Sequence, residues 1–200
     1  FNKYGERFTF GGAVFYTWFR NAIVTDKFQF NGQDSIIYNG VMSEVRANQN
    51  KASAYLYGFS MNISYKFAKN TNAEAVYTYT YGQFKNADGS KVPLDHIPPG
   101  FGRVSVKHTE QIWNAEVFTL FNGWKRIEDY NPYGEDNQQY ATPDGMPSWI
   151  TLNIRAAVNL NANSFLQLTV ENLFDKNYRY FASGISAPGR NFVLSLKASF

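Results

Sequence analysis

The sequence of 200 residues contains no cysteine, so it can form neither a disulfide nor a thiolate metal site. It has no run of the roughly 18–20 consecutive apolar residues that a membrane-spanning helix needs. Residues 1–7 lack the charged and apolar segments of a signal peptide. These absences exclude a helical membrane protein. They leave a β-barrel open, because only every second residue of a barrel strand faces lipid.

Motifs of catalysis are also missing. The sequence has no GxSxG, HExxH or glycine-rich phosphate loop. The net charge of +3 comes without a basic block, so no nucleic-acid partner is expected. Of the two histidines, His96 falls in an expected loop and His108 beside a turn at the opposite end. We therefore predict no catalytic residue, no metal site and no cofactor, with haem ligation by His96 and calcium binding by acidic residues of 128–144 as less favoured alternatives.

Aromatic residues are abundant, with 14 Tyr, 18 Phe and 4 Trp making up 18% of the chain. Apolar and polar residues alternate with period two in eight segments, which indicates strands with two different faces. These segments are 8–18, 57–67, 73–81, 103–107, 113–121, 149–160, 166–171 and 192–200. In the last one, Leu194 and Leu196 share a face, and Ser195 and Lys197 lie opposite. We predict an all-β fold of antiparallel strands.

The connections between these segments alternate in length. Short ones follow Phe67, His108 and Leu160, and long ones run roughly over 25–51, 84–101, 123–148 and 175–190. Residues 2–7 are expected to form another turn. Short turns on one side and long loops on the other are typical of outer-membrane barrels, whose long loops lie outside the cell.

Three features favour lipid over water on the apolar face. The strands are longer than the typical soluble length of about 5–6 residues. Their other face carries charge, and the pattern places Arg103, Lys107, Arg155 and Lys197 toward a lumen, where we expect them to pair with carboxylates of a plug or with water. Aromatic residues gather near the expected strand ends, where rings favour the headgroup layer. These are Trp18, Tyr65, Phe67, Tyr79, Tyr81, Trp113, Phe121, Trp124, Trp149, Phe192 and Phe200. A soluble β-sandwich remains an alternative, because its strands also alternate.

The end of the chain combines the segment 170–179 (VENLFDKNYR), the segment 187–192 (APGRNF) and a terminal Phe200. This combination resembles the C-terminal signature of TonB-dependent receptors. The segments 96–103 (HIPPGFGR) and 50–59 (NKASAYLYGF) are similar to two further parts of that family, although Ser60 stands where an acidic residue is common.

The resemblance implies a barrel of 22 strands around a plug domain. Residues 1–200 would form the last eight strands, with the C-terminus in the periplasm and the plug domain outside this chain. Such a receptor imports a scarce ligand of the ferric siderophore, haem or cobalamin class with energy delivered by TonB, and it is not an enzyme. Its expected partners are TonB, through the missing N-terminal part, and the outer-membrane lipid, with a surface lipoprotein left open. The alternative is a complete eight-stranded barrel with a structural or adhesive role, in which the first and last strands would pair.

The long loop 123–148 is the best candidate for ligand contacts. Aromatic rings with an arginine can hold a flat or anionic ligand by stacking and cation–π contact. The candidates in this loop are Trp124, Arg126, Tyr130, Tyr133 and Tyr140. The competing interpretation is that these rings belong to the upper aromatic belt and to packing within the loop.

Overall fold

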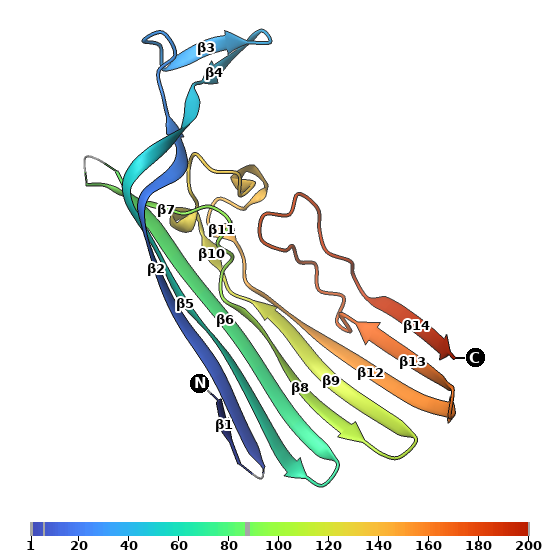
Figure 1. Cartoon of the computed structure of the whole chain (residues 1–200). Helices are drawn as coiled ribbons and strands as arrows, with labels where there is room; N and C mark the ends of the chain where they lie inside the picture. The colour runs from blue at the N-terminus through green and yellow to red at the C-terminus, as the bar shows by residue number, and fades with distance from the viewer. Residues whose placement is uncertain (1, 6, 87–88, 200) are drawn as a thin grey trace.

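The computed structural model describes residues 2–5, 7–86 and 89–199, which form one long antiparallel sheet (Figure 1). Its strands lie in the order β1–β2–β5–β6–β8–β9–β12–β13–β14, with β7 added beside β6. No helix in these ranges has the length and apolar content to cross a membrane. The sheet strands are β1 (Asn2–Tyr4), β2 (Phe8–Lys27), β5 (Arg46–Ala68), β6 (Thr71–Lys85), β7 (Lys91–Pro93), β8 (Phe101–Thr109), β9 (Trp113–Asn122), β12 (Trp149–Asn161), β13 (Ser164–Glu171) and β14 (Asn191–Ala198).

All eight predicted strands are present, as β2, β5, β6, β8, β9, β12, β13 and β14. The all-β fold class is therefore confirmed. The short turns lie at one end of the sheet and the long loops at the other (Figure 1). The loops hold two small ribbons, β3 (Ser35–Tyr38) with β4 (Val41–Glu44) and β10 (Lys125–Arg126) with β11 (Gly145–Met146), and the 3₁₀ turns η1 (Ile127–Asp129) and η2 (Gln138–Tyr140).

Two predictions about the first part of the chain are wrong. Residues 2–7 are not only a turn, because β1 pairs with β2 from Asn2 opposite Gly11 onward. The expected loop 25–51 is largely strand, since β2 continues to Lys27, β5 begins at Arg46, and the β3–β4 hairpin rises beyond them (Figure 1). At about 3.3 Å per residue, the 20 residues of β2 span roughly 66 Å, about twice a hydrocarbon core of about 30 Å.

The two faces of the sheet differ in the way that the alternation predicts. On the face that we call outer, Leu168 lies opposite Leu194 and Leu166 opposite Leu196, and Leu194 is 70% exposed. On the face that we call inner, Asn153 is only 2% exposed. The sheet thus exposes its apolar side chains and buries polar ones. This is the reverse of a water-soluble sheet and suits an outer face in lipid.

Two of the aromatic residues do not fit a belt at the strand ends. Trp18 lies in the middle of β2 because that strand runs on to Lys27. Trp149 pairs with Asn122 on the inner face and is buried, so it does not reach the lipid side. Phe200, the predicted terminal aromatic, lies outside the described residues.

The GR motif of the predicted receptor segment has a packing role. A side chain at Gly102 would meet the carbonyl of Val76 and the ring of Phe121, so only glycine fits beneath that ring. The Phe121 ring also stacks on Tyr77, with centroids 6.1 Å apart. Glycine covered by an aromatic ring from the neighbouring strand is a device that fixes strand register.

The C-terminal signature ties together the two ends of the loop between β13 and β14. The buried Asn172 side chain accepts a hydrogen bond from the Lys176 amide (2.9 Å) and donates one to the Lys176 carbonyl (2.8 Å). The Asp175 carboxylate accepts the Arg190 amide (2.8 Å), and Arg190 Nε donates to the Leu173 carbonyl (2.9 Å). The motif therefore satisfies backbone groups where the strand ladder stops.

Within the described residues, the sheet is open. Strands β1 and β14 lie at opposite edges and do not pair with each other. This contradicts the complete eight-stranded barrel, in which the first and last strands would meet. No second sheet packs face to face on the described sheet, which contradicts the soluble sandwich.

A charge placed on each face of β14 tests the assignment of the faces. In the full-length protein in lipid bilayers, Leu194→Lys should lower the free energy of unfolding by about 2–4 kcal/mol, the cost of a charge on the lipid face near the midplane. The neighbouring Ser195→Lys should cost much less. Urea unfolding measures both variants, and equal losses would contradict the assignment.

Removing the Asn172 side chain tests the loop closure. Asn172→Ala should destabilise the full-length protein by about 1–3 kcal/mol, because backbone groups of Lys176 lose their partners. Asn177→Ala is the control, since Asn177 is an exposed residue of the same loop. Urea unfolding of both variants in lipid gives the comparison. A loss of similar size in the control would argue against this role of Asn172.

Candidate functional site

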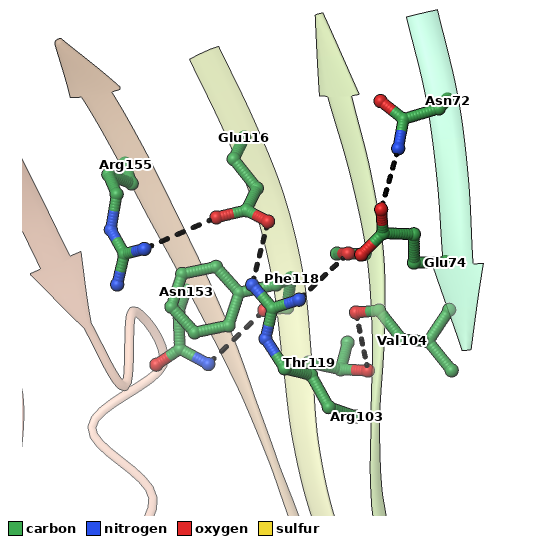
Figure 2. A network of polar contacts seen from close by, with 10 residues as sticks. Asn72, Glu74, Arg103, Val104, Glu116, Phe118, Thr119, Asn153 and Arg155 are labelled. Atoms are coloured by element: carbon green, nitrogen blue, oxygen red, sulfur yellow. Dashed lines mark hydrogen bonds and ion pairs between the residues drawn. The ribbon is translucent and has the colours of Figure 1, made fainter. Parts of the chain in front are cut away.

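A polar network crosses the inner face (Figure 2). Glu116 Oε1 lies 2.7 Å from Arg103 Nη2, and its Oε2 lies 3.5 Å from Arg155 Nη1. Both guanidinium groups lie over the Phe118 ring, at 4.5 and 5.2 Å from its centroid. Arg103 Nη1 also donates to Ser105 (2.9 Å). One carboxylate on β9 thus holds two arginines, Arg103 on β8 and Arg155 on β12.

The strand register confirms that Arg103, Lys107, Arg155 and Lys197 all face the inner side. The two arginines find their acidic partner in Glu116 of this same sheet, a partner that the sequence pattern did not identify. The group of two arginines and one glutamate keeps a net positive charge. Its ion pairs link three neighbouring strands.

The outward loops pack around a buried lysine. Lys125 Nζ donates to the Ile97 carbonyl (2.8 Å) and lies 5.2 Å from the Phe181 ring centroid and 5.8 Å from that of Tyr130. Burial lowers the pKa of Lys125, although nearby carboxylates, first that of Asp136, oppose this. Three segments that are distant in sequence, around residues 97, 125–130 and 181, are thereby joined.

Three carboxylates act on this lysine, those of Asp136, Asp129 and Asp95. Asp136 is buried and accepts the backbone amide of His96 (2.9 Å). Burial, and then the negative charge of Asp136, raise the pKa of Asp95. Within the described ranges, no three His, Asp or Glu side chains are arranged to hold a metal ion. The bond between His96 and Asp136 joins two loop segments that are distant in sequence.

The five residues predicted from the sequence fall into separate places. Arg126 stacks on Trp124 at 4.2 Å, and Trp124 Nε1 donates to the Asp144 carbonyl. The Tyr133 ring lies against Lys27 and Arg46, at the base of the raised hairpin. Tyr130 is buried beside Lys125, and Tyr140 is half exposed beside another loop. The structure brings Trp124 and Arg126 together but does not gather all five around one cavity.

Sequence reasoning missed a cavity of about 440 Å³ between the loops 123–148 and 172–190. Its lining includes Tyr140, Trp149, Lys176, Tyr178 and Arg179. The rings of Trp149 and Tyr178 are 4.3 Å apart. Arg179 Nη1 donates to the Tyr140 carbonyl (2.8 Å), which joins the two loops. The only sequence signal for this cavity is the aromatic and basic run at 176–180, most of which lies in the segment 170–179 that resembles the family signature.

The ionised residues that line this cavity are cationic, and the nearby carboxylate of Glu171 acts on its Tyr178. Its lining has two cationic side chains, Lys176 and Arg179, and no carboxylate. Neither cation forms an ion pair with any residue that the structure describes. Burial, and then a hydrogen bond with Tyr180, raise the pKa of Tyr178, so its hydroxyl stays neutral at physiological pH. The cavity combines neutral rings with positive charge.

Solved structures of larger barrels share this fold. The copper transporter OprC matches all of the chain with a TM-score of 0.76 and 20% identity. The ferric enterobactin receptor PfeA of Pseudomonas aeruginosa (0.69, 20%) and the FrpB iron transporter of Neisseria meningitidis (0.71, 13%) also match the whole chain. In each case, the chain spans 30% of the length of the solved structure.

Comparison by sequence gives a curated relative and a family. Lactoferrin-binding protein A of Neisseria meningitidis serogroup B is 26% identical over 133 residues, covering 54% of this chain and 14% of that protein. The family model described as "TonB dependent receptor-like, beta-barrel" matches residues 1–173. Proteins of this family are outer-membrane transporters rather than enzymes. Since the match covers most of the sequence, the chain belongs to the family of TonB-dependent receptor β-barrels.

Proposed function

We propose that residues 1–200 are the C-terminal portion of a receptor barrel of about 22 strands that imports a scarce extracellular ligand. The ligand is of the ferric siderophore, haem or cobalamin class, and TonB delivers the energy. The observation that carries the proposal is the open sheet, whose two edge strands, β1 and β14, need neighbours from outside this chain. A span of 30% of each solved relative supports the same conclusion.

The orientation follows from the two ends of the sheet. The connections β5–β6, β8–β9 and β12–β13 are short and lie together, and the loops that carry the candidate residues lie at the other end (Figure 1). We place the short turns in the periplasm and the long loops outside the cell, as in other barrels. The C-terminus then faces the periplasm, because β14 runs toward the short turns.

The partners follow from the proposed import. TonB would contact the N-terminal part that lies outside this chain, and a plug domain would fill the lumen against the inner face. The printed names of the relatives include a copper transporter, an iron transporter, a ferric enterobactin receptor and a lactoferrin-binding protein. These names favour a metal or a metal chelate as the ligand. A surface lipoprotein is a further partner if the metal source is a protein.

For ligand binding we propose the loop residues Trp124, Arg126, Tyr133 and Tyr140 as contacts, and Tyr130 as a residue that acts through the packing of the loop. The stacked pair of Trp124 and Arg126 presents an exposed ring and a cation together, as recognition of an anionic chelate requires. Tyr130 is buried, so its contribution is to hold Lys125 and the loop in place.

The import itself can be measured in cells. A strain without its own receptors for iron chelates, given the full-length gene, should accumulate radiolabelled ferric siderophore. Accumulation should stop when TonB is deleted or the proton gradient is collapsed, because the ligand moves against a concentration gradient. Binding at the cell surface should persist in both cases. Uptake that continues without TonB would contradict the proposal.

The Trp124–Arg126 pair can be tested against a matched pair elsewhere. Arg126→Gln should weaken binding of the imported ferric chelate about two- to thirty-fold, the range of a cation–π contact. Arg20→Gln removes the equivalent stack on Trp18, on the outer face of β2, and should leave affinity unchanged. Equilibrium binding to whole cells measures both. An equal loss in the two variants would contradict a role in ligand contact.

A further inference from the structure

The cavity between the loops 123–148 and 172–190 has a chemistry of its own. We propose that it binds a planar aromatic anion, a single ring that carries a carboxylate or ionised hydroxyl groups, as one arm of the imported ligand. This inference rests on the proposed import function, since it assigns a ligand group to the outward end of that barrel. It places recognition on Tyr140, Trp149, Lys176, Tyr178 and Arg179, four of which lie outside the candidates derived from the sequence.

The shape of the cavity suits a ring. Trp149 is only 7% exposed and forms a fixed wall, and the Tyr178 ring lies 4.3 Å from it, at an angle of 39°. Tyr180 meets Trp149 edge-on, at 5.1 Å, which holds the indole in place. The volume of about 440 Å³ falls within the range of small-molecule sites. Fixed aromatic walls favour flat ligand groups, because a ligand ring stacked with an offset on a wall ring gains energy beyond that of burying its apolar surface.

The charge of the cavity selects the sign of the ligand. Lys176 and Arg179 are its only ionised lining residues, and no carboxylate among the described residues pairs with them. Tyr178 stays neutral, so it adds no negative charge beside the two cations. A cationic ring would be repelled, and an uncharged ring would gain only the stacking. Hydrogen bonds between ionised groups are about twice as strong as neutral ones.

The cationic residues are held before any ligand arrives. Arg179 is fixed by its bond to the Tyr140 carbonyl, which also links the two loops. The backbone of Lys176 is held on both sides by the buried Asn172 side chain. A site whose backbone is already ordered loses less entropy on binding than a mobile loop. The signature segment 170–179 thus holds the backbone of Lys176 and the guanidinium group of Arg179 in place.

The test uses the full-length receptor in detergent and isothermal titration calorimetry at neutral pH. The probes are 2,3-dihydroxybenzoate, the uncharged ring catechol, the cationic ring benzylamine and inorganic phosphate. The aromatic anion should bind at least about tenfold more tightly than each of the other three. Lys176→Gln and Arg179→Gln should each weaken its binding about tenfold, the loss expected for one charge-assisted hydrogen bond. Lys91→Gln, an exposed cation on β7, should have no effect.

Two results would overturn the inference. One is equal affinity for 2,3-dihydroxybenzoate and catechol, and the other is unchanged affinity in both cavity variants. Because Arg179 also joins the loops, Lys176→Gln decides the matter if Arg179→Gln fails to fold. The TonB-dependent uptake of a ferric chelate is measured on the same receptor. If uptake is intact and the variants bind 2,3-dihydroxybenzoate as tightly as the unchanged protein, the cavity proposal alone is refuted. If 2,3-dihydroxybenzoate binds selectively but no TonB-dependent uptake occurs, the import function alone is refuted.

Discussion

The need to pair every backbone amide and carbonyl in hydrocarbon governs this structure. An unpaired group costs several kcal/mol in lipid, where water cannot replace the missing partner. The continuous hydrogen-bond ladder from β1 to β14 meets that need for every strand that lies between the two edge strands. Lipid also requires apolar side chains on the outer face, as Leu194 and Leu196 show. The polar residues therefore lie on the inner face. The Arg103–Glu116–Arg155 network is possible only because that face is shielded from lipid.

The sequence predicted the parts of the fold where the two faces meet different surroundings. Period-two alternation revealed all eight long strands because one face of each touches lipid and the other does not. It failed at β1, where Asn2–Tyr4 is too short to show a period. It also failed above the membrane, in the part of β2 that follows Trp18 and the part of β5 that pairs with it. Both faces of these segments lie in water, as the polar run Asn48, Gln49 and Asn50 of β5 shows. Without a difference between the faces, a strand leaves no alternating pattern.

The candidate site was less accessible to the same reasoning. Aromatic and cationic residues in one loop were visible, and the local Trp124–Arg126 stack followed from their closeness in sequence. The cavity needed a contact between residues 140 and 179, which only the folding of two loops creates. Trp149 was grouped with the lipid belt by its place at a strand end, but its pairing with Asn122 turns it inward. For Trp149, the alternation along the strand predicts the correct face of the sheet, whereas its place at the strand end does not.

The two bare edges have a consequence for how such a polypeptide must be handled. Strand β14 offers a row of unpaired amides and carbonyls beside a surface of Phe192, Leu194 and Leu196 that water cannot wet. Produced apart from the remainder of its barrel, this segment would find the missing neighbours in copies of itself. Strand would add to strand, and fibrous or amorphous precipitate would form instead of a dissolved monomer. Physically, the segment behaves as an arc of a ring whose stability depends on closure.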